Sequence, residues 1–139
     1  MKHIYTALLA MGIAMSANAQ TQLTEAVDFT VNDLDGNEHT LSDYLDAGKY
    51  VCIDFFAYWC GPCAAHAPFF TEVYNNYGCN GGDVIFMSME YEGSWDQTHD
   101  FEVANAGDNP APAISGAEGG GIAVHGDYGI AAYPTFILI

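Results

Sequence analysis

Two cysteines, Cys60 and Cys63, flank Gly61 and Pro62 near the middle of the chain. An apolar run precedes them and a segment with helical periodicity follows, so we expect Cys60 at the N-terminus of a helix. There the helix dipole and the unpaired backbone N–H groups stabilise a thiolate, which is the nucleophilic form of cysteine. Cys63, one turn later, can close a disulfide with Cys60. The spacing predicts a cycling pair: Cys60 attacks a substrate disulfide and Cys63 releases the reduced product.

Half a zinc site and a static loop disulfide are the alternatives for this cysteine pair. Zinc normally requires a second C-x-x-C or paired histidines. That spacing is missing among Cys79 and the histidines that follow the N-terminal segment, which are His39, His66, His99 and His125. Haem attachment would need a histidine at the position of Ala64. We therefore expect no metal and no cofactor.

The residues on either side of the pair predict a strand, a helix and a second strand. Tyr50 to Ala57 is rich in aromatic and β-branched residues without clear alternation, which is typical of a central strand covered on both faces. Apolar residues recur at helical spacing from Pro62 to about Tyr77, and Gly78 can end that helix. Asp83 to Met89 is the second strand. Such a unit predicts parallel pairing with a right-handed crossover.

The rest of the chain supplies shorter elements. Ser94 is placed to cap a second helix that runs to about Ala106, and Gly107 to end it. Because an apolar strand at a terminus would leave an exposed sheet edge, we expect the sequence to be a fragment. The other expected elements are a strand at 27–31, a turn at 32–37, helical turns at 40–45 and 123–128, a loop at 109–121 and a strand at 135–139.

Motifs spread over most of the chain resemble the thioredoxin superfamily. They are the run from Val51 to Cys63, then Pro68, Tyr128-Gly129-Ile130 and Tyr133-Pro134-Thr135. The opening resembles the exported TlpA/ResA-like (redoxin) branch through Asp28-Phe29, Asp35-Gly36 and Leu41-Ser42-Asp43-Tyr44. The resemblance spans roughly residues 25 to 139. It implies an α/β, thioredoxin-like three-layer fold with a central mixed sheet flanked by helices, truncated before the last hairpin strand and C-terminal helix.

The resemblance implies chemical roles for three residues. Cys60 would be the nucleophile and Cys63 the resolving cysteine. Asp54 matches the family's buried acid beneath the disulfide, which accepts the proton of the resolving thiol. Burial in an apolar strand raises the pKa of a carboxyl and lets it accept a proton near neutrality. The alternative for Asp54 is a carboxyl that reaches solvent at the end of a strand.

The resemblance also implies contacts with the substrate, at Trp59, Gly61, Pro62, Tyr133 and Pro134. Pro134 matches the family's cis-proline beside the disulfide, where Tyr133 and Pro134 would present their backbone to an extended substrate segment. Pro62 suits the first turn of a helix, and Gly61 allows another backbone to approach closely. Trp59 either flanks the site or packs as a core or rim aromatic.

Two further cysteines and one histidine need a separate account. Cys52 lies early in the central strand, and Cys79 follows the helix that returns to the same end of the sheet, so the two could meet. A structural disulfide and two unpaired thiols both remain open. His66 stands where many ResA-like members carry Glu, and we expect a solvated helix histidine there.

The first residues have the plan of a cleaved export signal. Met1-Lys2-His3 precedes an apolar run from Ile4 to Met15, and Ala17-Asn18-Ala19 follows. The apolar run is shorter than the roughly 20 residues of a spanning helix, which disfavours an uncleaved anchor. We expect a signal peptide over 1–19, a periplasmic or secreted product, and one domain over 20–139.

Acidic residues dominate the composition, with 18 Asp and Glu against 2 Lys and Arg and a net charge of −16. Such a surface repels phosphate backbones and anionic lipid headgroups, which argues against nucleic acid and membrane surfaces as partners. After signal cleavage we expect no stable membrane insertion. The expected partners are protein thiols and disulfides, together with an unidentified redox partner outside the cytoplasm.

The leading prediction is an exported oxidoreductase that uses Cys60 and Cys63 to reduce or exchange protein disulfides. Gly-Pro between the cysteines resembles the reducing thioredoxins, although direction depends on the reduction potential. A peroxiredoxin-type peroxidase is one alternative, but that signature has an Arg near its reactive cysteine and this chain has no Arg. A secreted, non-catalytic binding module on the same fold is the other.

Overall fold

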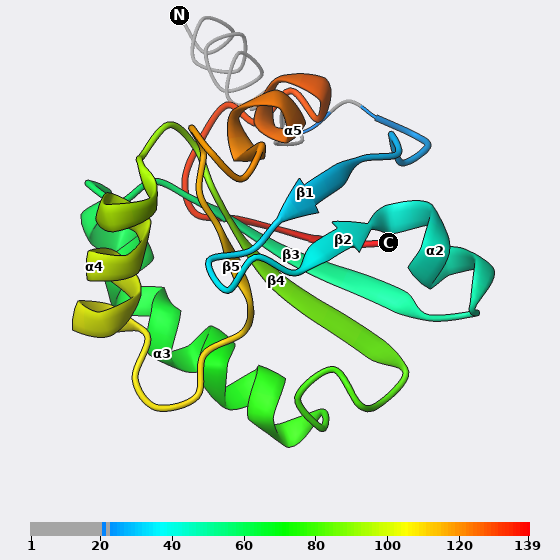
Figure 1. Ribbon diagram of the computed structural model, residues 1–139, viewed down its shortest axis with the longest axis horizontal. Coiled ribbons are helices and arrows are strands. Elements are labelled where there is room, and N and C mark those ends of the chain that lie inside the picture. Colours follow the sequence, from blue (N-terminus) through cyan, green and yellow to red (C-terminus); the bar gives the residue numbers. More distant parts are fainter. Residues whose placement is uncertain (1–20, 22) are drawn as a thin grey trace, which may run out of the picture.

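The central sheet has four strands in the order β5-β4-β3-β6 (Figure 1). The computed structural model describes residue 21 and residues 23–139, so the expected signal peptide lies outside the described residues. β3 pairs in parallel with β4 and antiparallel with β6, which makes the sheet mixed, as predicted. The strands are β3 (Tyr50–Phe56), β4 (Val84–Glu90), β5 (Ala113–Ile114) and β6 (Thr135–Leu138).

Helices α3 (Gly61–Asn76) and α4 (Trp95–Asn105) cover one face of this sheet. Their buried side chains join those of β3 and β4 in two clusters, one around Phe56 and Phe101 and one around Phe86. A third cluster covers the opposite face. It is formed with β1 (Thr30–Asn32), β2 (Glu38–Thr40), α2 (Leu41–Asp46) and α5 (Gly121–Asp127). The protein is therefore a layered α/β domain, in agreement with the sequence expectation.

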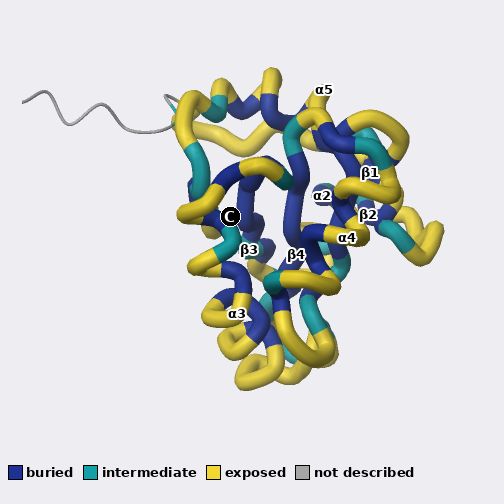
Figure 2. The backbone as a smooth tube through the Cα atoms, turned by 90° about the vertical axis from the view of Figure 1, so that its left-hand side faces the viewer, coloured by how far each residue is buried: buried dark blue, intermediate teal, exposed yellow. Residues whose placement is uncertain are grey.

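Strand β3 is buried on both faces, as its continuous apolar sequence predicts. Val51, Ile53 and Phe55 are fully buried in the cluster beneath α5. Cys52 and Phe56 point to the α3 side, because side chains alternate along a strand. In Figure 2 β3 and β4 run as buried segments behind more exposed helices and loops. The end of this buried strand positions the short loop that leads to Cys60.

Local capping signals set the ends of the two long helices. Cys60 is the N-cap of α3, and Pro62 stands in its first turn. Ser94 caps α4 through a capping box with Gln97, since each side chain contacts the backbone of the other. Gly78 and Gly107 follow the two helices with φ of 87° and 81°, a left-handed conformation that glycine adopts without strain. The predicted stop signals are confirmed.

Three elements differ from the sequence expectation. The predicted loop at 109–121 contains β5, whose Ala113 and Ile114 pair with Ser88 and Met89. A strand of two residues is too short to show an alternating pattern in the sequence, and this one forms only by pairing with β4. The first strand begins at Thr30 rather than at position 27, and α5 begins at Gly121, two residues before the predicted helical turn.

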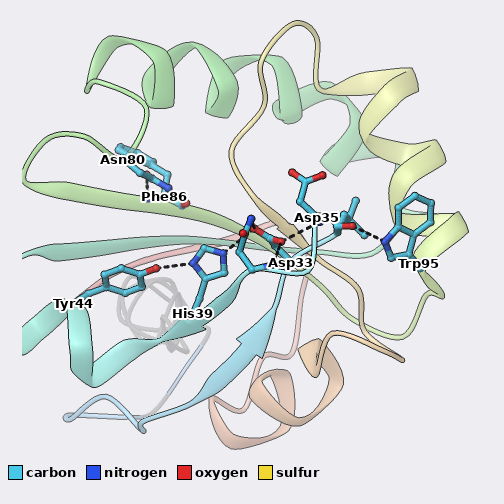
Figure 3. A network of polar contacts seen from close by, with 9 residues as sticks. Asp33, Asp35, His39, Tyr44, Asn80, Phe86 and Trp95 are labelled. Carbon is cyan, nitrogen blue, oxygen red and sulfur yellow. Dashed lines mark hydrogen bonds and ion pairs between the residues drawn. The ribbon is translucent and has the colours of Figure 1, made fainter.

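A buried polar network closes the β1–β2 hairpin (Figure 3). Asp33 Oδ1 accepts from the backbone N–H groups of Asp35 and Asn37, and Asp33 Oδ2 accepts from His39 Nε2 at 2.9 Å. His39 Nδ1 lies 2.6 Å from Tyr44 Oη on α2. Burial pushes the pKa of Asp33 upward, but the hydrogen bonds from His39 and Asn37 outweigh it and lower that pKa. The network joins the turn, the hairpin and α2 into one unit.

Candidate active site

Cys60 and Cys63 form a disulfide at the N-terminus of α3. Their Cα atoms are 5.2 Å apart, and the backbone N–H of Cys63 donates to Cys60 Sγ at 3.2 Å. Both residues are buried, whereas Gly61 and Pro62 are exposed. The dipeptide and the rim of the helix therefore form the accessible approach to the sulfur atoms. This is the helix-terminus placement that the spacing predicts.

The loop before Cys60 brings an aromatic side chain over the site. Trp59 is 56% exposed and donates from its indole Nε1 to Glu92 Oε1 at 3.0 Å. Its ring meets that of Tyr133 edge to face, with centroids 6.1 Å apart. Trp59 thus lies on the rim of the site, held by one hydrogen bond and one ring contact.

The peptide bond between Tyr133 and Pro134 is cis. It lies directly before β6, next to the central strand that leads to the disulfide. The Tyr133 ring packs against the cluster that contains Cys60 and Cys63. Tyr133 and the cysteine pair, which are distant in the sequence, therefore lie in the same cluster.

Asp54 lies in the middle of β3 on the side of the sheet that faces α3. Ser88 and Phe136 are its neighbours on the adjacent strands. The residue is 5% exposed, and its Oδ1 atom is buried without a hydrogen-bond partner. Burial raises the pKa of Asp54 to about 7, because the charged form loses its hydration. A carboxyl with this pKa exchanges protons at neutral pH.

A second buried acid, Glu90, supports the active-site loop. It ends β4, is fully buried and accepts from the backbone N–H groups of Tyr58 at 3.1 Å and Gly116 at 3.3 Å. A short hydrogen bond from the backbone of Gly93 completes the set. Burial raises the pKa of Glu90, and these hydrogen bonds act against the rise. Glu90 ties the segment before Cys60 to two neighbouring loops.

Two more buried titratable residues were not singled out from the sequence, where nothing distinguishes them from surface residues. Glu102 on α4 is 7% exposed; burial, together with the charge of Asp54, raises its pKa to about 8. His125 on α5 is 2% exposed and donates from Nε2 to the carbonyl oxygen of Met89 at 3.0 Å. Burial lowers the pKa of His125 to about 4, so the ring is neutral at pH 7. Its Nδ1 has no hydrogen-bond partner.

The disulfide considered between Cys52 and Cys79 is not formed, and both residues are free thiols. Cys52 packs toward the Phe86 cluster, whereas Cys79 is exposed after α3 and its sulfur contacts Asn75 Oδ1 at 3.3 Å. Burial, with a smaller effect of the Asp54 charge, raises the pKa of Cys52 to about 11. The two side chains have separate surroundings, which is why the pairing does not occur.

His66 is exposed on α3, with its ring near those of Phe69 and Phe136. No three His, Cys, Asp or Glu side chains within the described part of the chain gather into a metal-binding group. Among the same residues, no helix combines the length and apolar character needed to cross a membrane.

A family model described as the AhpC/TSA family matches residues 23–139. The chain belongs to this family. Thiol-disulfide oxidoreductase ResA of Geobacillus thermodenitrificans is 35% identical over 88 residues, which are 59% of this chain and 49% of the relative. The protein of the same name from Bacillus thuringiensis strain Al Hakam is 32% identical over 115 residues, covering 83% of this chain and 61% of the relative. The chain thus spans about half to three fifths of the length of these relatives.

Solved structures share the fold at lower identity. The thioredoxin domain of a thiol-disulfide oxidoreductase from Bacteroides vulgatus superposes with a TM-score of 0.66 and 22% identity, covering 82% of this chain and 77% of that one. A secreted Mycobacterium tuberculosis disulfide oxidoreductase homologous to DsbE has a TM-score of 0.63 and 21% identity, with coverage of 79% and 74%. The thioredoxin-like fold expected from the motifs is confirmed.

Proposed function

We propose that this chain is an exported thiol–disulfide oxidoreductase that reduces or exchanges protein disulfides through Cys60 and Cys63. The observation that carries the proposal is the disulfide at the first turn of α3, in a cluster against which Tyr133, the residue before the cis Pro134, packs. The names of the ResA relatives support the same chemistry. A structural disulfide would gain nothing from a helix N-terminus, whereas a redox pair gains a stabilised thiolate.

In the reducing direction the Cys60 thiolate attacks one sulfur of a substrate disulfide. The substrate S–S bond breaks, a mixed disulfide with Cys60 forms, and the first substrate sulfur leaves as a thiolate that takes a proton from water. Cys63 then gives its proton to the Asp54 carboxylate and attacks Cys60 Sγ, which releases the second substrate sulfur. The substrate gains two electrons and the Cys60–Cys63 pair loses two. A redox partner must return them.

The rim of the site fits an extended polypeptide. Trp59, Gly61 and Pro62 are exposed and adjoin the two cysteines in the chain, and half-buried Tyr133 packs against the cluster that contains both cysteines. In the proposal, the backbone of Tyr133 and Pro134 hydrogen-bonds to the substrate segment, a contact that does not depend on the substrate's side chains. This favours a reductant of many protein disulfides over an enzyme for one small molecule.

Export belongs to the proposal because of the sequence of residues 1–19, with its basic start, apolar run and small-residue cleavage site. Protein disulfides form and persist outside the cytoplasm, so an exported enzyme would meet its substrates there. The redox partner would then be a soluble or membrane-bound electron donor in that compartment.

Equilibration in thiol buffers of graded potential, followed by mapping of cysteine pairing by mass spectrometry, tests the proposal. We expect a reversible two-electron transition confined to Cys60 and Cys63, whose midpoint gives the direction of the reaction. A Cys60→Ala variant should exchange no disulfide with a substrate. If the two cysteines never interconvert reversibly, the protein is a binding module and the proposal is wrong.

A further inference from the structure

Glu102 lies on the buried face of α4. It shares that face with Thr98 and with Phe101, whose ring lies 4.7 Å from that of Phe56 at the end of β3. Only 7% of Glu102 is exposed. A helix usually turns a glutamate toward water, since a buried carboxylate without a cationic partner is unfavourable. Its burial beside the active-site cluster therefore calls for a chemical explanation.

The second carboxyl in this layer is Asp54. Its Oδ1 atom is sealed from solvent and makes no hydrogen bond. The two acids lie in the same layer, because Phe101, the neighbour of Glu102 on α4, contacts Phe56, two residues after Asp54 on the same side of β3. Burial and, to a smaller extent, the charge of Asp54 raise the pKa of Glu102. Two carboxyls that interact in a poorly hydrated layer avoid carrying two charges, and near neutrality they retain one proton between them.

Glu102 reaches a cavity at the surface of this layer. Glu102 lines a cavity of about 560 Å³ between α4, the β1–β2 turn and the segment before β5, and Asp54 is not among the lining residues. Asp35 and Trp95 also line it, and Figure 3 shows the Trp95 indole directed at the turn that carries Asp35. The other titratable groups that line it are Asp33, Asp35, Tyr74 and His99.

We propose that Glu102 relays the proton of the resolving step between Asp54 and the water of this cavity. The inference rests on the proposed function. When Cys63 attacks Cys60 Sγ, its S–H proton passes to the Asp54 carboxylate. Glu102, which holds the shared proton, releases that proton to the water of the cavity and then takes the proton from Asp54. No electrons move in these transfers, and at the end Asp54 is again ionised and Glu102 again protonated. In the oxidising direction the proton travels the opposite way.

A two-stage reaction with an aromatic disulfide tests the relay on the full chain. Such a reagent releases one coloured thiolate when Cys60 forms the mixed disulfide and a second when Cys63 resolves it. All proteins carry Cys79→Ser, which removes the exposed thiol outside the site. The variants are Glu102→Gln, Glu102→Asp, Asp54→Asn and the Asp54→Asn/Glu102→Gln double variant. Glu72→Gln on the exposed side of α3 is the charge-matched control.

We expect Glu102→Gln to leave the first release unchanged and to slow the second about tenfold, less than the loss of a direct proton acceptor. Its pH profile should lose one of the two ionisations near neutrality. Added imidazole should restore the second release in Glu102→Gln but leave the parent rate unchanged, since imidazole replaces a missing proton carrier. Glu102→Asp should retain most of the rate, and the double variant should be no slower than Asp54→Asn alone.

An unchanged rate and pH profile for the second release in Glu102→Gln would overturn the relay and leave the proposed function intact. Equal slowing of both releases without rescue by imidazole would show a structural role and overturn it as well. Absence of any second release in the parent protein would refute the oxidoreductase itself.

Discussion

At the scale of single residues, the site depends on polar groups kept away from water. The Oδ1 atom of Asp54 is buried without a hydrogen-bond partner, and burial raises the pKa of this carboxyl to about 7. Burial that destabilises its charge therefore also suits it to the proposed role of proton acceptor at neutral pH. Cys60 gains from the opposite arrangement, since the free N–H groups of α3 favour its thiolate.

Replacing Asp54 with Asn should slow resolution of the mixed disulfide by about a hundredfold, the usual worth of a positioned proton acceptor. Formation of the mixed disulfide by Cys60 should change little, because that step needs no proton acceptor once the thiolate exists. Stopped-flow measurement of the two thiolate releases distinguishes the steps. Equal rates of resolution in the variant and the parent would remove Asp54 from the mechanism.

The sequence predicted the cysteine pair, Trp59, Asp54 and the cis-proline position because each lies in a short recognisable motif. It did not predict Glu90 or Glu102. Each is an ordinary acidic residue in its local sequence and becomes special only when distant segments bury it. The sequence also could not decide whether Cys79 pairs with Cys52. The order of the elements allowed that disulfide, but in the structure the Cys79 sulfur contacts Asn75 instead.

At the scale of elements, local signals determined the long segments. The apolar run of β3, the cap at Ser94 and the stop at Gly107 were all readable in the sequence and are present in the structure. β5 was missed because its two residues become a strand only by pairing with β4. Helix α4 holds Glu102 buried against the sheet, where the proposed relay requires it.

Loss of the cap should loosen α4. Ser94→Ala removes the side-chain acceptor for the Gln97 N–H, at 3.3 Å, and breaks the capping box. We expect a loss of about 1 kcal/mol in the free energy of unfolding, measured by urea denaturation of the oxidised protein. Ser94→Asp should keep most of the stability, because Asp is an equally good N-cap. A loss in Ser94→Asp as large as in Ser94→Ala would contradict the capping explanation.

At the scale of the whole molecule, buried titratable groups set how stability depends on pH. Burial raises the pKa of Asp54 to about 7 from 3.8, and that of Glu102 to about 8 from 4.5. The folded protein holds these protons after the unfolded chain has released them, so both groups lower stability as pH rises. His125 has the opposite effect between about pH 4 and 6.5. In this range the histidine is protonated in the unfolded chain but neutral in the folded protein, so its contribution makes stability rise with pH.

Stability of the oxidised protein should therefore fall between pH 6.5 and about 8, where only the raised carboxyls titrate among these groups. Urea unfolding at a series of pH values measures this slope. The Asp54→Asn/Glu102→Gln double variant should show a much flatter profile and be more stable at the upper end. A parent protein whose stability rises through this interval would contradict the assigned burial of both acids.

Cys79 also gives the molecule an internal standard for thiol counting. This exposed cysteine should be alkylated quickly whatever the redox state of the active pair, while Cys52, half-buried and with a pKa of about 11, should react slowly in both states. Only Cys60 and Cys63 then change their labelling with redox state. The ratio of label on the active pair to label on Cys79 reports the reduced fraction directly, without any need to know the protein concentration.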